Sequence, residues 1–201
     1  MSNPDREIAI QLMEASFDGN PAVYFSIGKG KNYIKKRKAL AEFLTDYSIL
    51  RKGLFISSNK KGVICFYSSE EHIPFFQEII LEIKLLFKAV GIWRLPRVIW
   101  RSFLVKKQQR KIGAHLHCWY LGASTEGRDF TTANELKDIL YKASDRLQLP
   151  VLAETTMTQN NRVYERMGFS TYATVVVSGM TTFCMIREPK KSIENSSTRS
   201  F

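Results

Sequence analysis

Cysteine is scarce in this chain, and its distribution argues against two kinds of stabilised small domain. The 201 residues contain three cysteines, Cys65, Cys118 and Cys184, an odd number with wide spacing and no C-x-x-C pair. This spacing indicates neither a disulfide framework nor a zinc site. We therefore expect no bound metal and three reduced thiols, as is typical of a protein of the cytoplasm.

Acidic side chains are also few in comparison with basic ones. There are 19 Asp and Glu against 30 Lys and Arg, which gives a net charge of +11. The imbalance is greatest between Lys84 and Lys111, where nine basic residues occur without an acidic one. No nucleic-acid recognition motif accompanies this charge, so we expect no specific nucleic-acid partner.

Long apolar runs are also lacking. Basic residues such as Lys84, Lys88 and Arg94 interrupt every apolar window that could span a bilayer. The first residues, Met1 to Asp5, are polar and lack the apolar core of a secretory signal. Both features favour a cytoplasmic location.

Apolar periodicity predicts an alternating series of helices and strands. In the second expected helix, Ile34, Ala41, Phe43 and Leu44 are candidates for the buried face. Residues 1–187 are expected to form one domain with a helical insertion at about 68–113, and the polar segment 188–201 is expected to be a disordered tail. The expected helices are 6–17, 32–47, 75–90, 93–111 and about 132–147; the expected strands are 54–57, 63–67, 114–123, 151–153, 170–178 and 181–187.

The strand at 114–123, the helix after it and the strand at 151–153 form a unit that is typical of a parallel strand pair. Thr132 and Glu135 have the spacing of a capping box, which predicts a helix start near Thr132. Parallel sheets place ligands at the carboxyl ends of their strands. The unpaired amide groups at a helix N-terminus suit a phosphate, so the loop at 124–130 is the expected binding site.

The segment Asn160 to Phe169, NNRVYERMGF, follows the second of these strands. It resembles the last conserved block of the GNAT acetyltransferase superfamily, which commonly reads N-x-x-x-Y-E-R/K-x-G-F. The resemblance is specific over about residues 115–169. It implies a mixed α/β fold, with a central twisted mixed sheet flanked by helices and, in this chain, a basic helical insertion before the central strand.

The resemblance also implies acetyl-CoA as the cofactor. The family's pyrophosphate turn, R/Q-x-x-G-x-G/A, matches Arg128, Asp129, Phe130, Thr131, Thr132 and Ala133. Thr131 stands where the family has its middle glycine, and Asp129 adds a negative charge beside the phosphate position. The pantetheine arm of coenzyme A would pair with the strand end at Leu121, Gly122 and Ala123, which separates from the next strand, and Asn160 would contact the same arm.

Catalytic roles follow from the same resemblance. Tyr164 matches the family tyrosine that faces the thioester sulfur and protonates the departing thiolate. The general base is open among three candidates: His117, which shares a strand face with His115; Glu154, just past the strand at 151–153; and a water chain without a dedicated base.

The implied function is transfer of an acetyl group from acetyl-CoA to a small-molecule or peptide amine by direct attack. One alternative is a module of the same fold that binds acyl-CoA or a partner with little turnover. Another is a peripheral membrane-associated protein that uses the basic, aromatic segment 84–111. That segment has three explanations at this stage: a solvated basic face, a funnel for phosphates, or contact with an anionic membrane.

Replacing Arg128 with alanine tests the phosphate role of the turn. We expect weaker binding of coenzyme A and little change in the binding of a pantetheine thioester that lacks the phosphates, because only the former offers an anion to the guanidinium. Titration calorimetry with both ligands measures the difference. Equal losses for both ligands would remove the phosphate role from Arg128.

Overall fold

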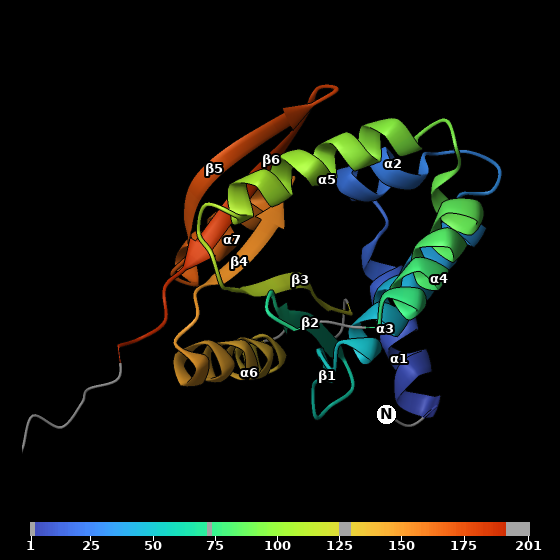
Figure 1. Ribbon diagram of the computed structural model, residues 1–201. Helices are drawn as coiled ribbons and strands as arrows, with labels where there is room; N and C mark the ends of the chain where they lie inside the picture. The colour runs from blue at the N-terminus through green and yellow to red at the C-terminus, as the bar shows by residue number, and fades with distance from the viewer. Residues whose placement is uncertain (1–2, 72–73, 125–129, 192–201) are drawn as a thin grey trace, which may run out of the picture.

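The computed structural model describes residues 3–71, 74–124 and 130–191. A six-stranded sheet runs through the molecule, and helices pack on both of its faces (Figure 1). This mixed α/β architecture confirms the fold class expected from the sequence. Of the predicted tail at 188–201, residues 192–201 lie outside the described part of the chain, as do Arg128 and Asp129.

The strand order in the sheet is β1-β2-β3-β4-β6-β5. β3 and β4 are parallel, as the strand–helix–strand unit predicts, and every other neighbouring pair is antiparallel. The parallel pair therefore lies at the centre of the sheet. The strands are β1 (Leu54–Ile56), β2 (Gly62–Ser68), β3 (Leu116–Ala123), β4 (Val151–Thr155), β5 (Ser170–Val177) and β6 (Met180–Arg187).

The helices divide between the two faces of the sheet. α1 and α3 pack on one face around Met13, Ala41 and Val63, and α6 packs on the other around Leu136 and Leu140. α5 lies over β5 (Figure 1). The helical elements are α1 (Asn3–Ser16), α2 (Pro21–Ile27), α3 (Tyr33–Leu50), α4 (Phe75–Leu85), the π-helical turn η1 (Leu86–Val90), α5 (Leu95–Gln109), α6 (Phe130–Leu147) and α7 (Thr158–Arg166).

One prediction about the first helices is wrong. Ile34 is 68% exposed, because it lies in the first turn of α3, beyond the part of the helix that packs on the sheet. Between the first two expected helices the structure has a further short helix, α2, which was not predicted from the sequence. Its N-cap is Asn20, whose side chain accepts a hydrogen bond from the Ala22 amide, and Pro21 occupies the first helical position, where a missing N–H costs nothing.

The expected capping box at the start of α6 is also wrong. α6 begins at Phe130, so Thr132 lies inside the helix. Thr132 is fully buried, and its hydroxyl accepts a hydrogen bond of 2.7 Å from Asn59 Nδ2. The Glu135 carboxylate accepts a bond of 2.8 Å from the Ser58 amide. Contacts with the turn between β1 and β2 therefore engage both side chains, which sequence spacing alone assigned to a local cap.

None of the helices in the described ranges has the length and apolar character that a bilayer crossing needs. The apolar helix α4 has 11 residues and gives way to η1 at Leu86.

Packing of α6 against the sheet gives a stability prediction with a control on the same helix. Leu140 is fully buried, whereas Leu147 is 47% exposed. Leu140→Ala should lower the free energy of unfolding by about 2–5 kcal/mol, because it removes buried apolar contacts and leaves a cavity. Leu147→Ala should cost far less. Denaturant unfolding of both variants measures the difference, and equal losses would mean that Leu140 is not a core residue.

Candidate active site

The central parallel strands separate partway along their length. β3 and β4 pair at only three positions, from Leu116–Val151 to Cys118–Ala153. Beyond Cys118, β3 stays paired with β2 as far as Ala123, and β4 stays paired with β6 as far as Thr155. The β4-facing edge of Leu121–Ala123 therefore has no strand neighbour within the described chain. An edge of this kind is free to pair with an extended ligand.

Leu121, Gly122 and Ala123, the predicted pantetheine contacts, all lie on this separated part of β3. Gly122 is required there by a close approach: a Cβ atom at this position would lie 2.2 Å from the Tyr120 hydroxyl oxygen. The Tyr120 hydroxyl is hydrogen-bonded to Ser16 of α1. The strand end is thus held against α1 while its opposite edge remains available.

His117 and Glu154, two of the separate candidates for the general base, form one unit. His117 Nε2 lies 2.9 Å from Glu154 Oε2, and the side chains are 13% and 12% exposed. His117 on β3 is paired with Leu152, one position before the last pair of the two strands, and Glu154 on β4 directly follows that last pair. The dyad therefore stands where the strands begin to diverge.

Two further side chains fix this dyad. Gln109 Nε2, at the end of α5, donates a hydrogen bond of 2.7 Å to Glu154 Oε1. The Tyr67 hydroxyl, on β2, lies 3.0 Å from His117 Nδ1. The four residues come from three strands and a helix, so the site depends on the assembled fold.

The charge state of Glu154 follows from these contacts. Burial raises the pKa of the carboxyl group, but the nearby His117, the Gln109 hydrogen bond and the positive charge of Arg101 together outweigh burial, and the pKa lies below its usual value. Glu154 is therefore an ionised carboxylate at neutral pH.

An ionised carboxylate only accepts hydrogen bonds, so Nε2 of His117 carries the proton of that bond. In the neutral ring, Nδ1 is then the acceptor for the Tyr67 hydroxyl. Burial raises the pKa of Tyr67, which keeps this phenol protonated and able to donate. The imidazole can take up one further proton, at Nδ1.

His115 has a different environment. Its Nδ1 lies 2.7 Å from the Gly113 carbonyl oxygen, and the residue is buried. Burial is the main cause of a lowered pKa, although the Gly113 hydrogen bond opposes it. The ring centroids of His115 and His117 are 6.3 Å apart. His115 shares the face of His117, as the strand period predicts, but its hydrogen bond is to the backbone and not to Glu154.

Tyr164 lies across the sheet from the dyad. Its ring packs edge-on against Phe169, with centroids 5.2 Å apart, in the cluster that contains Cys118 and Ala153. Burial raises the pKa of the phenol, and Cys118 and Glu154 add to the effect. Within the described residues its hydroxyl makes no hydrogen bond. Tyr164 is therefore a protonated phenol close to the divergence of β3 and β4.

The cysteine beside His117 does not share its environment. Cys118 is buried on the α6 face with Leu136 and Leu140, and burial raises the pKa of its thiol. A thiol of this kind is a poor nucleophile, because the reactive form is the thiolate.

The predicted phosphate turn is described only in part, since Arg128 and Asp129 lie outside the described residues. Phe130, Thr131, Thr132 and Ala133 form the first turn of α6. Thr131 is exposed and does not have a positive φ. Thr131, which was expected to match the glycine of the family turn, therefore has no strain from a positive φ.

Asn160 is in the first turns of α7 and is exposed, with its Nδ2 3.7 Å from Met157 Sδ. It does not touch the dyad. Its amide faces the start of the helix that carries Tyr164.

Sequence reasoning missed Gln109, Tyr67 and Arg101. Arg101 Nε donates a bond of 3.2 Å to Thr182 Oγ1, and burial lowers the pKa of its guanidinium. A signal was present in the segment 93–111, since Arg101, Val105 and Gln109 are four residues apart and so share one face of a helix. That face is the one that packs inward.

Comparisons with known proteins connect this geometry to a fold. No protein-family model and no curated protein matches the sequence. Solved structures do match in fold. The histone acetyltransferase HPA2 and related acetyltransferase from Corynebacterium glutamicum is 14% identical, with a TM-score of 0.64 over 96% of each chain.

Two insect enzymes match over a similar length. Arylalkylamine N-acetyltransferase 2 from Aedes aegypti is 14% identical, with a TM-score of 0.58 over 94% of this chain and 97% of that one. The polyamine N-acetyltransferase of Drosophila melanogaster is 12% identical, with a TM-score of 0.61 over the same shares. The chain therefore has the fold of GNAT acetyltransferases, as the segment from Asn160 to Phe169 predicts.

Proposed function

We propose that this protein is an N-acetyltransferase that moves the acetyl group of acetyl-CoA to an amine. The observation that carries the proposal is the His117–Glu154 dyad at the divergence of β3 and β4, with the Tyr164 phenol on the other side of the sheet. A proton acceptor and a proton donor on either side of one opening are what aminolysis of a thioester needs.

The residues present fit the donor. The edge at Leu121, Gly122 and Ala123, which has no strand neighbour in the described structure, has backbone groups to offer the amide-containing pantetheine arm, and the N-terminus of α6 is the proposed contact of the pyrophosphate. Arg128 and Asn160 are further proposed contacts. Acetyl-CoA, when bound, supplies the activated acetyl thioester.

The proton transfers are assigned to this chain's own groups. The dyad takes the proton that the amine loses as its nitrogen attacks the acetyl carbon; Glu154 stabilises the positive charge that then develops on His117. Tyr164 gives its phenolic proton to the sulfur as the C–S bond breaks. The raised pKa means that the phenol is protonated at neutral pH, so its hydroxyl is available as a donor to the sulfur as negative charge develops there.

The acceptor is proposed to be a small-molecule or peptide amine. An ionised carboxylate at the opening favours an acceptor that arrives as an ammonium ion, because the charges attract. The similar structures include enzymes named for arylalkylamines and polyamines, which supports a small amine.

Calorimetric titration with acetyl-CoA, followed by a thiol-release assay with a set of amines, tests the function. Micromolar binding with amine-dependent thiol release is the expected result. Binding without release would favour the alternative of an acyl-CoA-binding module, and absence of binding would contradict both.

Tyr164→Phe tests the general acid. We expect kcat to fall by about 10²-fold or more with little change in acetyl-CoA affinity, because the hydroxyl acts only when charge develops on sulfur. Tyr141→Phe is the matched control: Tyr141 donates its hydroxyl hydrogen bond to the Met167 carbonyl oxygen, away from the opening, so kcat should be retained. Parallel losses of rate and affinity in Tyr164→Phe would make this tyrosine a packing residue.

Glu154→Gln tests the dyad in two ways. Turnover should fall by about 10²–10⁴-fold, because a neutral amide does not stabilise a protonated His117. The second test is stability at low pH. The folded pKa of Glu154 lies below its unfolded value of about 4.3, so its stabilisation is present above that pH and is lost as the pH falls through the folded pKa.

The melting temperature of the wild type should therefore decrease more steeply below about pH 4.3 than that of Glu154→Gln. Melting curves over a pH series measure this slope. Identical slopes, or unchanged turnover, would separate Glu154 from the proposed role.

A further inference from the structure

Six large apolar side chains between Phe87 and Phe103 are exposed in the described structure, and two of them, Trp100 and Phe103, stack on each other. Trp93 is 94% exposed, Phe87 82% and Ile92 73%. Ile99, Trp100 and Phe103 on α5 are each about half exposed. These six residues are called the 87–103 apolar face. Exposed aromatic clusters of this kind are uncommon on a monomer and mark an interaction site.

The helix that carries half of this face has two distinct sides. Arg101, Val105 and Gln109 point inward, toward β5, Thr182 and Glu154. Trp100 and Phe103 point outward with Lys107, and all three are exposed. At 100° per residue, Trp100, Phe103 and Lys107 share one face of the helix. The outer side of α5 is therefore apolar at Trp100 and Phe103 and basic near its C-terminus, at Lys107.

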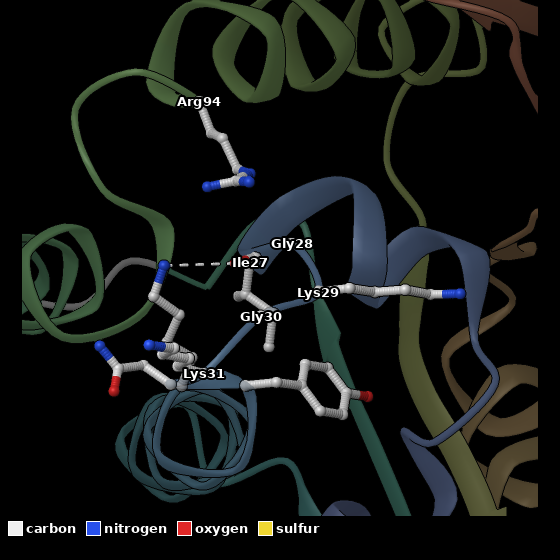
Figure 2. A pocket seen from close by; sticks show the side chains of 9 residues that line it. Ile27, Gly28, Lys29, Gly30, Lys31 and Arg94 are labelled. Atoms are coloured by element: carbon white, nitrogen blue, oxygen red, sulfur yellow. Dashed lines mark hydrogen bonds between the residues drawn. The ribbon is translucent and has the colours of Figure 1, made fainter.

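A basic pocket adjoins the apolar face. It has a volume of about 180 Å³, and four cationic residues, Lys29, Lys31, Lys36 and Arg94, line it without an acidic residue (Figure 2). Arg94 directly follows Trp93 in the chain. The Arg94 Nε atom is buried, and no hydrogen-bond partner for it exists in the described structure.

Gly28 leaves the space that the Arg94 side chain occupies at the pocket. A Cβ atom at Gly28 would lie 2.4 Å from Arg94 Nη2, so a side chain there would displace the guanidinium. Gly28 also has a positive φ of 76°, which favours glycine at this position. The Arg94 guanidinium lies beside Gly28 at the pocket, whose lining also includes Lys29 and Lys31 from the loop that leads into α3.

We propose that the 87–103 apolar face and the basic pocket form a docking surface for a membrane of anionic phospholipids. Trp93 and Ile92 enter the headgroup and upper acyl region, and the pocket holds a lipid phosphate. The charge pattern favours this occupant, since the segment from Lys84 to Lys111 has no acidic residue and exposes Lys106, Lys107, Arg110 and Lys111.

Other occupants account for less of the surface. A second copy on the same face would bring two strongly basic segments together, and like charges across an interface oppose association. A nucleic acid would satisfy the charge but would leave the exposed apolar residues in contact with water. An anionic membrane would contact both the basic residues and the exposed apolar residues. This inference is independent of the proposed acetyl transfer.

Vesicle co-sedimentation of the full chain tests the docking surface. The protein should sediment with vesicles of phosphatidylcholine mixed with phosphatidylglycerol and remain in solution with phosphatidylcholine alone. Added salt should weaken the binding, because part of the attraction is between charges. No binding to the anionic vesicles, or equal binding to both kinds, would overturn the proposal.

Two pairs of variants locate the surface. Phe87→Ser with Trp93→Ser should weaken vesicle binding by about tenfold or more, whereas Val176→Ser, at an apolar residue 62% exposed on β5, should not.

Lys29→Glu with Lys31→Glu should weaken binding by about tenfold or more, and Lys142→Glu with Arg146→Glu on α6 should have a much smaller effect for the same change in net charge. Circular dichroism confirms that each variant is folded. Equal losses within either pair would overturn the proposal.

Light scattering after size exclusion distinguishes a second copy as the occupant. We expect a monomer in solution, and a dimer that Trp93→Ser dissociates would overturn the membrane proposal.

Competition with glycerol phosphate distinguishes a free anion from a lipid. Displacement of the protein from vesicles at equal phosphate concentration would mean that the pocket binds phosphate alone and that the apolar face has no part in docking.

Discussion

The need to compensate one buried negative charge organises the centre of this molecule. Glu154 is 12% exposed, and removal of a carboxylate from water is costly unless hydrogen bonds and opposite charge replace the water. His117 and Gln109 supply the hydrogen bonds, and Arg101 supplies positive charge nearby. These partners come from β3 and α5, so the ionised state of Glu154 exists only when the strands and the helix are assembled.

The pairing of β3 and β4 determines where that charge lies. If the two strands stayed paired to their ends, Glu154 would be one more residue of a closed sheet. Because pairing stops at Cys118 and Ala153, the carboxylate lies at the start of an opening whose edge, at Leu121 to Ala123, has backbone groups to offer a ligand. Only residues 124–129 separate the end of β3 from the start of α6 in the sequence, so the first turn of α6 follows the opening closely along the chain. The early end of pairing between β3 and β4 therefore determines both the shape of the sheet and the position of the candidate site.

Regular periodicity was sufficient to predict most of the elements, although not α2, but it did not predict their contacts. The six strands and α6 could be predicted because alternation and helical spacing are local properties of Leu136, Leu140 and their neighbours. The partners of the dyad could not. Gln109 lies 45 residues before Glu154, and Tyr67 lies 50 before His117, so only the tertiary structure brings them together. The error at Thr132 has the same origin, since its partner, Asn59, is 73 residues away.

α5 shows how one sequence pattern can satisfy two environments. A basic, aromatic segment allows a solvated basic face, and the structure divides the charge instead: Arg101 is turned inward and partly loses its hydration, whereas Lys107 is exposed. The inward arginine helps to keep Glu154 ionised, and the outer side near Trp93 is left apolar. A helix that only covered the sheet would need neither Trp93 nor Trp100 in water. Their exposure is therefore the strongest indication that the outer side of α5 has a binding role separate from the dyad on its inner side.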